Sequence, residues 1–115
     1  KDYGLVKLTE KGKQKVLKYN LETMKLTKPE KWDGKWRLVI YDIAQLKRRQ
    51  QTALRLMFRQ LEFLPLQKSV YLTPYPCEKE VTFLREFFGV GEEVLYMTVE
   101  QLEHQDMYKL HFGLT

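Results

Sequence analysis

The sequence predicts an α+β domain of the ferredoxin-like class, a βαββαβ sandwich, with an N-terminal strand and helix in front of it. Residues 36–43 carry apolar side chains on both pleat faces, as a buried central strand does. Segments with helix and strand periodicity then follow in the order helix, strand pair, helix, strand. The chain has 115 residues, 43% of them hydrophobic, which is enough for one small domain with a core.

The N-terminal part divides into two segments. Residues 1–8 have the apolar content of a strand, and Thr9 can cap a helix with a weak apolar stripe that ends at Met24. Residues 25–35 are rich in Lys, Thr, Pro, Glu and Asp, and Pro29 breaks any helix there. We therefore expect a first unit at residues 1–24, a linker at 25–35 and the main domain at 36–115.

The central strand places Trp36, Leu38 and Ile40 on one face. Its other face carries Val39, Tyr41 and Ile43. The two helices of the expected fold cover only one side of the sheet. The other side therefore needs a second copy of the domain or the N-terminal segment, and we expect a homodimer.

The remaining elements follow from spacing and from helix-breaking residues. Apolar residues recur at helical intervals up to about residue 62, where Pro65 bars continuation. Residues 66–73 predict a strand, which a hairpin near Gln67 and Lys68 can divide into two. A shorter helix, with Glu78 and Glu80 in its first turn, ends at Gly89 and Gly91, and a strand follows at 94–99. The tail from residue 101 alternates as a strand does but also fits a helix, and we expect a short helix from Asp106 to Gly113.

Charge is distributed unevenly along the chain. Residues 1–35 carry a net charge of +5, residues 36–62 carry +4 and residues 63–115 carry −4. A basic half suggests a polyanionic partner, with nucleic acid the usual one, although a lysine-rich solvated surface has the same composition. The single cysteine, Cys77, and the lack of an export signal or long apolar run indicate a cytoplasmic protein without membrane contact.

Two motifs resemble known families. The pattern from Val39 to Ile43, the cluster Lys47-Arg48-Arg49 and the later Ser69-Val70-Tyr71 resemble the CRISPR-associated protein 2 nucleases, which are ferredoxin-like homodimers. The segment 32–37, which leads into the central strand, and the segment 65–70 resemble more closely the central domain of PaaX-type transcriptional repressors. Residues 8–13 look like the wing strand and following helix that would end an upstream winged-helix domain.

The resemblance to the nucleases implies a set of site residues. Asp42, paired with Asp42 of the dimer mate, would be the catalytic residue and would hold a Mg²⁺ ion that activates water. Lys47, Arg48, Arg49 and Arg55 would contact phosphates, together with Ser69 on the neighbouring strand. The alternative for Asp42 is a backbone hydrogen bond in the turn that it starts. Leu72 stands where the family nucleases carry an acid.

We therefore expect a nucleic-acid-associated dimerisation domain of a PaaX-like regulator, with DNA favoured over RNA. The alternative is a magnesium-dependent endonuclease, or an inactive relative that clamps DNA. A third alternative, which the PaaX resemblance allows, is a domain that senses an acyl-thioester inducer. Mg²⁺ is expected only if the protein is a nuclease.

Overall fold

The computed structural model of the chain describes residues 2–3, 6–7 and 9–114, without the side chains of residues 2–8 and 43. The described elements, in chain order, are β1 (Asp2–Tyr3), β2 (Val6–Lys7), α1 (Glu10–Thr23), β3 (Trp36–Tyr41), a 3₁₀ turn (Ile43–Gln45), α2 (Arg48–Gln60), β4 (Leu64–Gln67), β5 (Val70–Thr73), α3 (Glu78–Phe88), β6 (Val94–Val99) and α4 (Gln105–Phe112). From β3 to β6 the order is the βαββαβ order that the sequence predicts.

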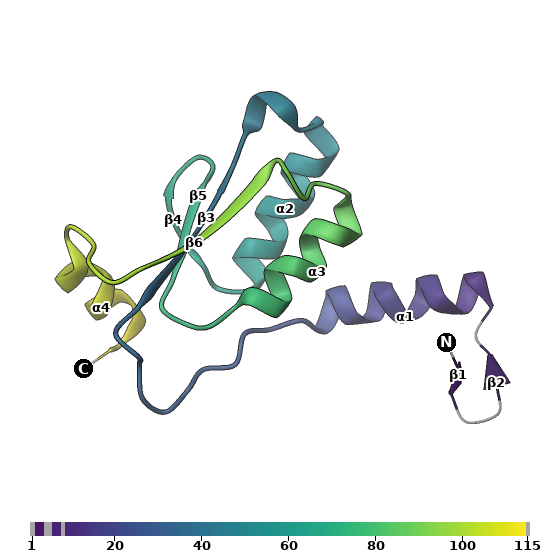
Figure 1. Cartoon of the computed structure of the whole chain (residues 1–115), viewed down its shortest axis with the longest axis horizontal. Coiled ribbons are helices and arrows are strands. Elements are labelled where there is room, and N and C mark those ends of the chain that lie inside the picture. The colour runs from purple at the N-terminus through teal and green to yellow at the C-terminus, as the bar shows by residue number, and fades with distance from the viewer. Residues whose placement is uncertain (1, 4–5, 8, 115) are drawn as a thin grey trace.

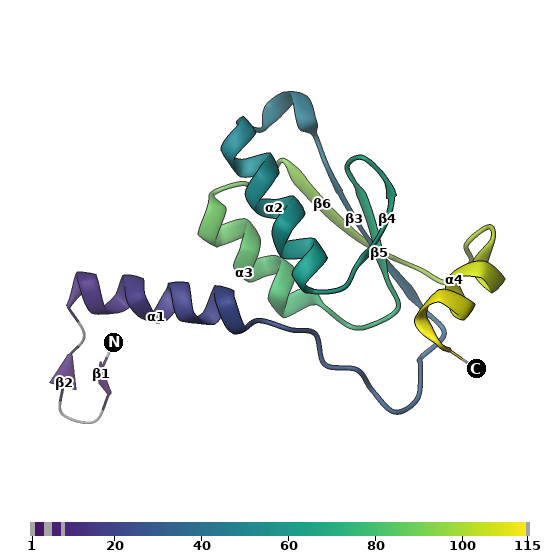
Figure 2. The ribbon, with the colours of Figure 1, turned by 180° about the vertical axis from the view of Figure 1, so that it is seen from behind.

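The main domain is built on one antiparallel sheet with the strand order β4-β5-β3-β6. β3 lies in the middle, with Val39 opposite Tyr71 of β5 and opposite Tyr96 of β6. Helices α2 and α3 both lie on the same side of this sheet (Figures 1 and 2). The predicted α+β class, with β3 as the central strand, is confirmed.

The core lies between the sheet and these two helices. Leu54 and Phe58 of α2 and Leu84 of α3 are almost fully buried against it. The ring of Phe58 stacks on Tyr71 with 4.9 Å between the centroids and on Tyr41 at 6.4 Å. Burial of a large apolar side chain contributes about 1.5–3 kcal/mol, so these residues fix α2 on the sheet.

The opposite face of the sheet is covered only at one end. There α4 packs on Trp36, which is fully buried. The indole contacts Tyr108 and Phe112 at centroid distances of 6.1 and 6.3 Å, and its Nε1 donates a hydrogen bond of 3.2 Å to Gln105. The N-terminal segment does not supply this cover: α1 extends away beside the helix layer (Figure 1).

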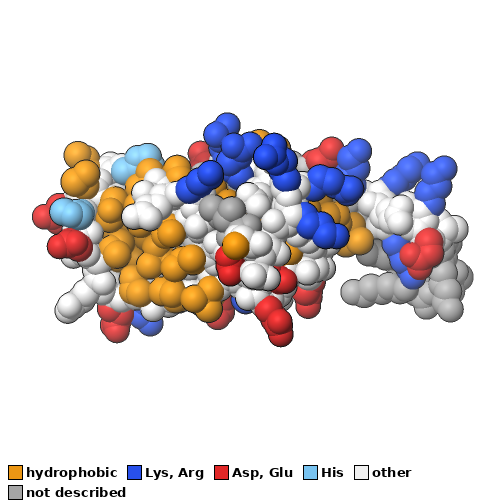
Figure 3. Space-filling model, turned by 90° about the horizontal axis from the view of Figure 1, so that it is seen from above, with side chains coloured by type: hydrophobic (Ala, Val, Ile, Leu, Met, Phe, Trp, Pro, Cys, Tyr) orange, Lys and Arg blue, Asp and Glu red, His pale blue; other side chains and the backbone are white. Residues whose placement is uncertain are grey.

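The rest of this face, here called the open face, stays accessible. Ile40 pairs with Val70 of β5 on one side and with Leu95 of β6 on the other, and Leu38 pairs with Met97. Leu95 is 55% exposed, and the other four are partly exposed. These five apolar side chains form a continuous surface across three strands. Figure 3 shows a broad apolar patch on the left half of the molecule.

A buried cation holds the linker to the start of β3. Arg37 is 6% exposed, and its guanidinium donates hydrogen bonds of 3.0 and 2.6 Å to the two carboxylate oxygens of Asp33. It also donates to the carbonyl oxygens of Lys35 and Pro74. This arrangement lowers the pKa of Asp33, chiefly through the hydrogen bond from Arg37.

The structure differs from the sequence predictions around two residues. The strand expected from residue 66 begins at Leu64, so Pro65 lies inside β4. Because β4 is an edge strand with a register shift between Pro65 and Gln67, the missing N–H of proline is tolerated there. The strand expected at 36–43 ends at Tyr41, and Ile43 belongs to the 3₁₀ turn.

The N-terminal unit is described in part. Thr9 caps α1 as expected, with its Oγ1 accepting a hydrogen bond of 3.0 Å from the N–H of Gly12. Gln60 of α2 donates to the carbonyl oxygens of Leu21 and Met24 at 2.8 and 2.9 Å, which attaches the end of α1 to the main domain. The strand expected across residues 1–8 includes residues 1, 4, 5 and 8, which lie outside the described residues, and the winged-helix assignment of residues 1–24 stays a prediction.

Candidate nucleic-acid interface

Helix α2 separates apolar and basic side chains onto opposite faces. Leu54, Met57 and Phe58 are buried against the sheet. On the outer face, Arg48, Thr52, Arg55 and Arg59 follow one another at intervals of three or four residues and are all exposed. The helix contains no acidic residue, so its outer face is a row of cations.

The β4–β5 hairpin adds a further cation beside this row. A hollow of about 300 Å³ is lined by Arg48, Thr52 and Arg55 of α2 and by Lys68 of the hairpin turn. A second hollow of about 320 Å³ is lined by Arg55, Arg59 and Lys68, together with Pro65 and Tyr71. Because Arg55 and Lys68 line both, the two hollows form one continuous feature, here called the basic groove.

The cations of the basic groove face solvent, and no carboxylate in the described part of the chain pairs with them. Among the described residues, no ion pair within 4 Å involves Arg48, Arg55, Arg59 or Lys68. Glu62, the acid closest to the end of α2 in sequence, pairs with Lys28 at 3.1 Å. Figure 3 shows Lys and Arg side chains gathered along the upper edge of the middle of the molecule. Such a surface attracts a polyanion, because neighbouring carboxylates of the chain do not offset its positive charge.

The structure brings together only some of the predicted phosphate contacts. Arg48 and Arg55 line the basic groove, whereas Lys47 and Arg49 are exposed at the start of α2 and do not line it. Ser69 lies in the hairpin turn and is half-buried, and its carbonyl oxygen accepts a hydrogen bond of 3.1 Å from the N–H of Tyr41.

Two groove residues were absent from the predicted set. Arg59 continues the spacing of Arg48 and Arg55 by one helical turn, so the helical period was the signal that could have found it. Lys68 is brought to α2 by the fold of the hairpin, and no local pattern in the sequence indicates that contact.

Asp42 follows β3 directly and is exposed. Its Oδ1 accepts a hydrogen bond of 3.0 Å from the N–H of Ala44, and its carbonyl oxygen accepts one of 3.1 Å from the N–H of Gln45. The carboxylate therefore stabilises the turn between β3 and α2, as an Asx turn does. This contact was the alternative reading of Asp42 from the sequence.

The nuclease resemblance would place a magnesium site between Asp42 of two copies. Within the described part of the chain, no three residues of the types His, Cys, Asp and Glu gather closely enough to hold a metal ion. One carboxylate oxygen of Asp42 is also engaged by Ala44. Mg²⁺ keeps several waters and binds through one or two protein carboxylates, so the residues that would hold the ion are Asp42 and Asp42 of a second copy, as the nuclease resemblance implies.

Cys77 is a buried thiol. It is 1% exposed, and burial raises the pKa of the thiol to about 12. Burial therefore disfavours the thiolate near neutral pH, and a buried thiol of this kind is a poor nucleophile.

The family described as the PaaX protein central Cas2-like domain matches residues 29–111. The chain belongs to this family. The match begins in the linker before β3 and ends within α4, so it spans the whole sheet, both covering helices and the basic groove of this PaaX-family domain.

Comparison with curated proteins and with solved structures gave no match to this chain. In the described part of the PaaX-family domain, no helix is long and apolar enough to cross a membrane.

Proposed function

We propose that this chain is a nucleic-acid-associated dimerisation domain of a cytoplasmic, PaaX-like transcriptional regulator. The observation that carries the proposal is the basic groove, in which four cations from α2 and the hairpin turn face solvent beside one another. The family match supports a regulator, because it assigns the sheet and both helices to the PaaX central domain.

The groove suits the sugar-phosphate backbone of DNA. Arginine and lysine side chains on a helix surface neutralise phosphates and position a duplex, but phosphate contacts carry no base information. Base reading requires an element that enters a groove of the duplex. The groove is bordered by the β4–β5 hairpin and by the side of α2, so we expect this domain to bind unrelated duplexes equally.

The open face supports the dimerisation part of the proposal. Leu38, Ile40, Val70, Leu95 and Met97 present a continuous apolar surface that α2 and α3 do not cover. Packing two open faces against one another would remove these side chains from water. The α4 helices, which each cover Trp36, would border such an interface.

The direct test is a titration of labelled duplexes of unrelated sequence with the purified chain. Affinities that agree within a few-fold and fall with salt support the proposal. Two results would contradict it: strong preference for one sequence, or binding that is unchanged when Arg48, Arg55, Arg59 and Lys68 are all changed to Gln. The variant Lys79→Gln, on α3, is a control outside the groove.

A further inference from the structure

β6 is the unprotected edge of the sheet. The other edge strand, β4, carries Pro65, a register shift and the adjacent Lys68, which are the usual protections of an edge. β6, Val94–Val99, contains no proline or charged residue, and its pairing with β3 is regular over all six residues. Leu95 and Thr98 on this strand are exposed.

The hydrogen-bond register shows which β6 groups face outward. The N–H of Asp42 donates to the carbonyl oxygen of Glu93 at 3.0 Å. In an antiparallel pair, bonded positions alternate, so Leu95, Met97 and Val99 bond to β3, and Val94, Tyr96 and Thr98 point to the free edge. The carbonyl oxygen of Val94 already accepts a hydrogen bond of 3.2 Å from Arg85. The backbone groups of Tyr96 and Thr98 remain for a further strand.

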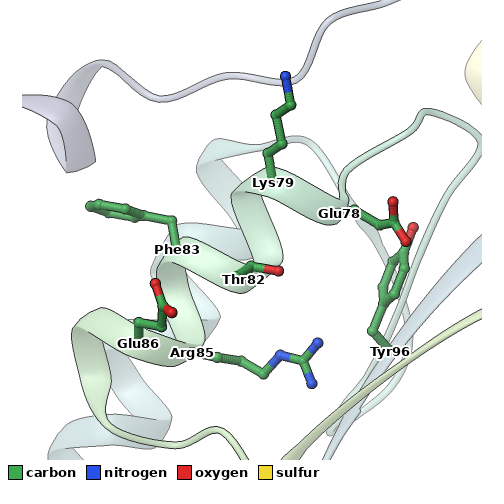
Figure 4. Close-up of a pocket in the computed structure, with 7 residues that line it drawn as sticks. All are labelled: Glu78, Lys79, Thr82, Phe83, Arg85, Glu86 and Tyr96. Atoms are coloured by element: carbon green, nitrogen blue, oxygen red, sulfur yellow. The ribbon is translucent and has the colours of Figure 1, made fainter.

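Space for a further strand lies beside this edge. A hollow of about 460 Å³ is lined by Tyr96 of β6 and by Glu78, Lys79, Thr82, Phe83, Arg85 and Glu86 of α3. In Figure 4, Arg85 extends from α3 toward the strand, and Tyr96 stands opposite the start of the helix. A strand added to β6 would place alternate side chains on the α3 side, where this hollow begins.

We propose that the β6 edge pairs with β6 of a second copy of this chain, antiparallel and with Met97 opposite Met97 on a two-fold axis. This register places Tyr96 opposite the second copy's Thr98, so each such pair exchanges both of its outward backbone hydrogen bonds. On the open-face side it places Leu95 opposite Val99. Every cross-strand pair on that side is then apolar.

Charges at the ends of β6 fit the same register. Glu100 of the second copy falls opposite Val94, beside the guanidinium of Arg85 that binds the Val94 carbonyl oxygen. Glu93 falls opposite Gln101. A shift of two residues, with Tyr96 opposite Tyr96, would instead put Glu92 opposite Glu100 and would need the Val94 carbonyl oxygen that Arg85 occupies.

This edge contact is separate from the open-face contact of the proposed function. Edge pairing joins two four-stranded sheets side by side, whereas open-face packing joins sheets face to face. A chain that uses both contacts assembles beyond a dimer. Each contact can be removed without the other. A change at Thr98, whose N–H points outward from the β6 edge, affects the edge contact, and a change at Ile40 affects the open-face contact.

The test is sedimentation equilibrium of four proteins: the unchanged chain, Ile40→Glu, Thr98→Pro and the double variant. Thr98→Pro removes an outward donor without breaking the ladder to β3, and Thr98→Val, which keeps the N–H, is its matched control. We expect the unchanged chain to exceed a dimer, each single variant to be dimeric and the double variant to be monomeric. The dissociation constant of the edge contact should rise about ten-fold or more in Thr98→Pro and stay unchanged in Thr98→Val.

The outcomes separate the two contacts. If Thr98→Pro has the same mass as the unchanged chain, the edge proposal is wrong. If Ile40→Glu has the same mass as the unchanged chain, open-face dimerisation is wrong and the edge proposal stands or falls with Thr98→Pro alone. Amide hydrogen exchange gives a second readout, since the amides of Tyr96 and Thr98 should become protected as protein concentration rises. Circular dichroism checks that each variant is folded, and loss of the fold in Thr98→Pro leaves amide protection as the deciding result.

Discussion

Removing Arg55 and Lys68 should change the salt dependence of DNA binding by a calculable amount. These two side chains line both hollows of the basic groove, so a duplex that follows the groove passes both. Each phosphate neutralised contributes about −0.9 to the slope of log affinity against log salt. Four groove cations give a slope of about −3.6, and two give about −1.8.

The difference is large over an accessible salt range. Between about 50 and 200 mM salt, the unchanged chain should lose about 150-fold in affinity, whereas the variant Arg55→Gln/Lys68→Gln should lose about 12-fold. Fluorescence anisotropy of a labelled duplex at four salt concentrations measures both slopes. A control pair, Lys79→Gln/Lys109→Gln, makes the same change in net charge on α3 and α4 and should keep the original slope. Equal slopes for the groove variant and the unchanged chain would refute the assignment of the groove.

Two predictions concern residues outside the groove. Asp33→Asn should lower the free energy of unfolding by about 1 kcal/mol, less than the roughly 3 kcal/mol of a fully buried pair, because the Asp33 side chain is 45% exposed. Since the pKa of Asp33 is lowered in the folded protein, this contribution is present above the unfolded pKa of about 3.9 and is lost as pH falls through the lower folded value. Urea melts of both proteins should therefore differ at pH 7 and converge near pH 2, and a constant difference would count against the ion pair. Asp42→Ala should cost about 1 kcal/mol through the lost hydrogen bond to Ala44 and should leave DNA binding unchanged. Metal-dependent cleavage of a phosphodiester substrate that disappears in Asp42→Ala would instead establish the nuclease alternative.

Much of the fold could be predicted because its signals are local. The apolar run at Trp36–Tyr41, with apolar side chains on both faces, predicted the central strand, and Gly89, with φ of 64°, ends α3 where the sequence indicated. The helix does end before Pro65, but the next strand was placed too late, from residue 66, because a proline that stops a helix is also tolerated in an edge strand, and edge position depends on the strand order.

The site was harder to predict because it depends on contacts between distant residues. The charge run Lys47-Arg48-Arg49 is conspicuous in the sequence, yet consecutive residues at the start of a helix point in different directions, and only Arg48 of the three lines the groove. Lys68 joins the groove through the hairpin turn, and α4 covers Trp36 through packing between segments about 70 residues apart, as the hydrogen bond from Trp36 to Gln105 shows. Such contacts are set by the tertiary fold.

Sedimentation velocity of the unchanged chain mixed with a short labelled duplex tests the central claim most directly. The account predicts that at low salt the duplex sediments with chains bound in multiples of two, and that it sediments alone at high salt, whatever its sequence. A duplex that sediments alone at low salt, or that carries a single chain at saturation, would contradict the account.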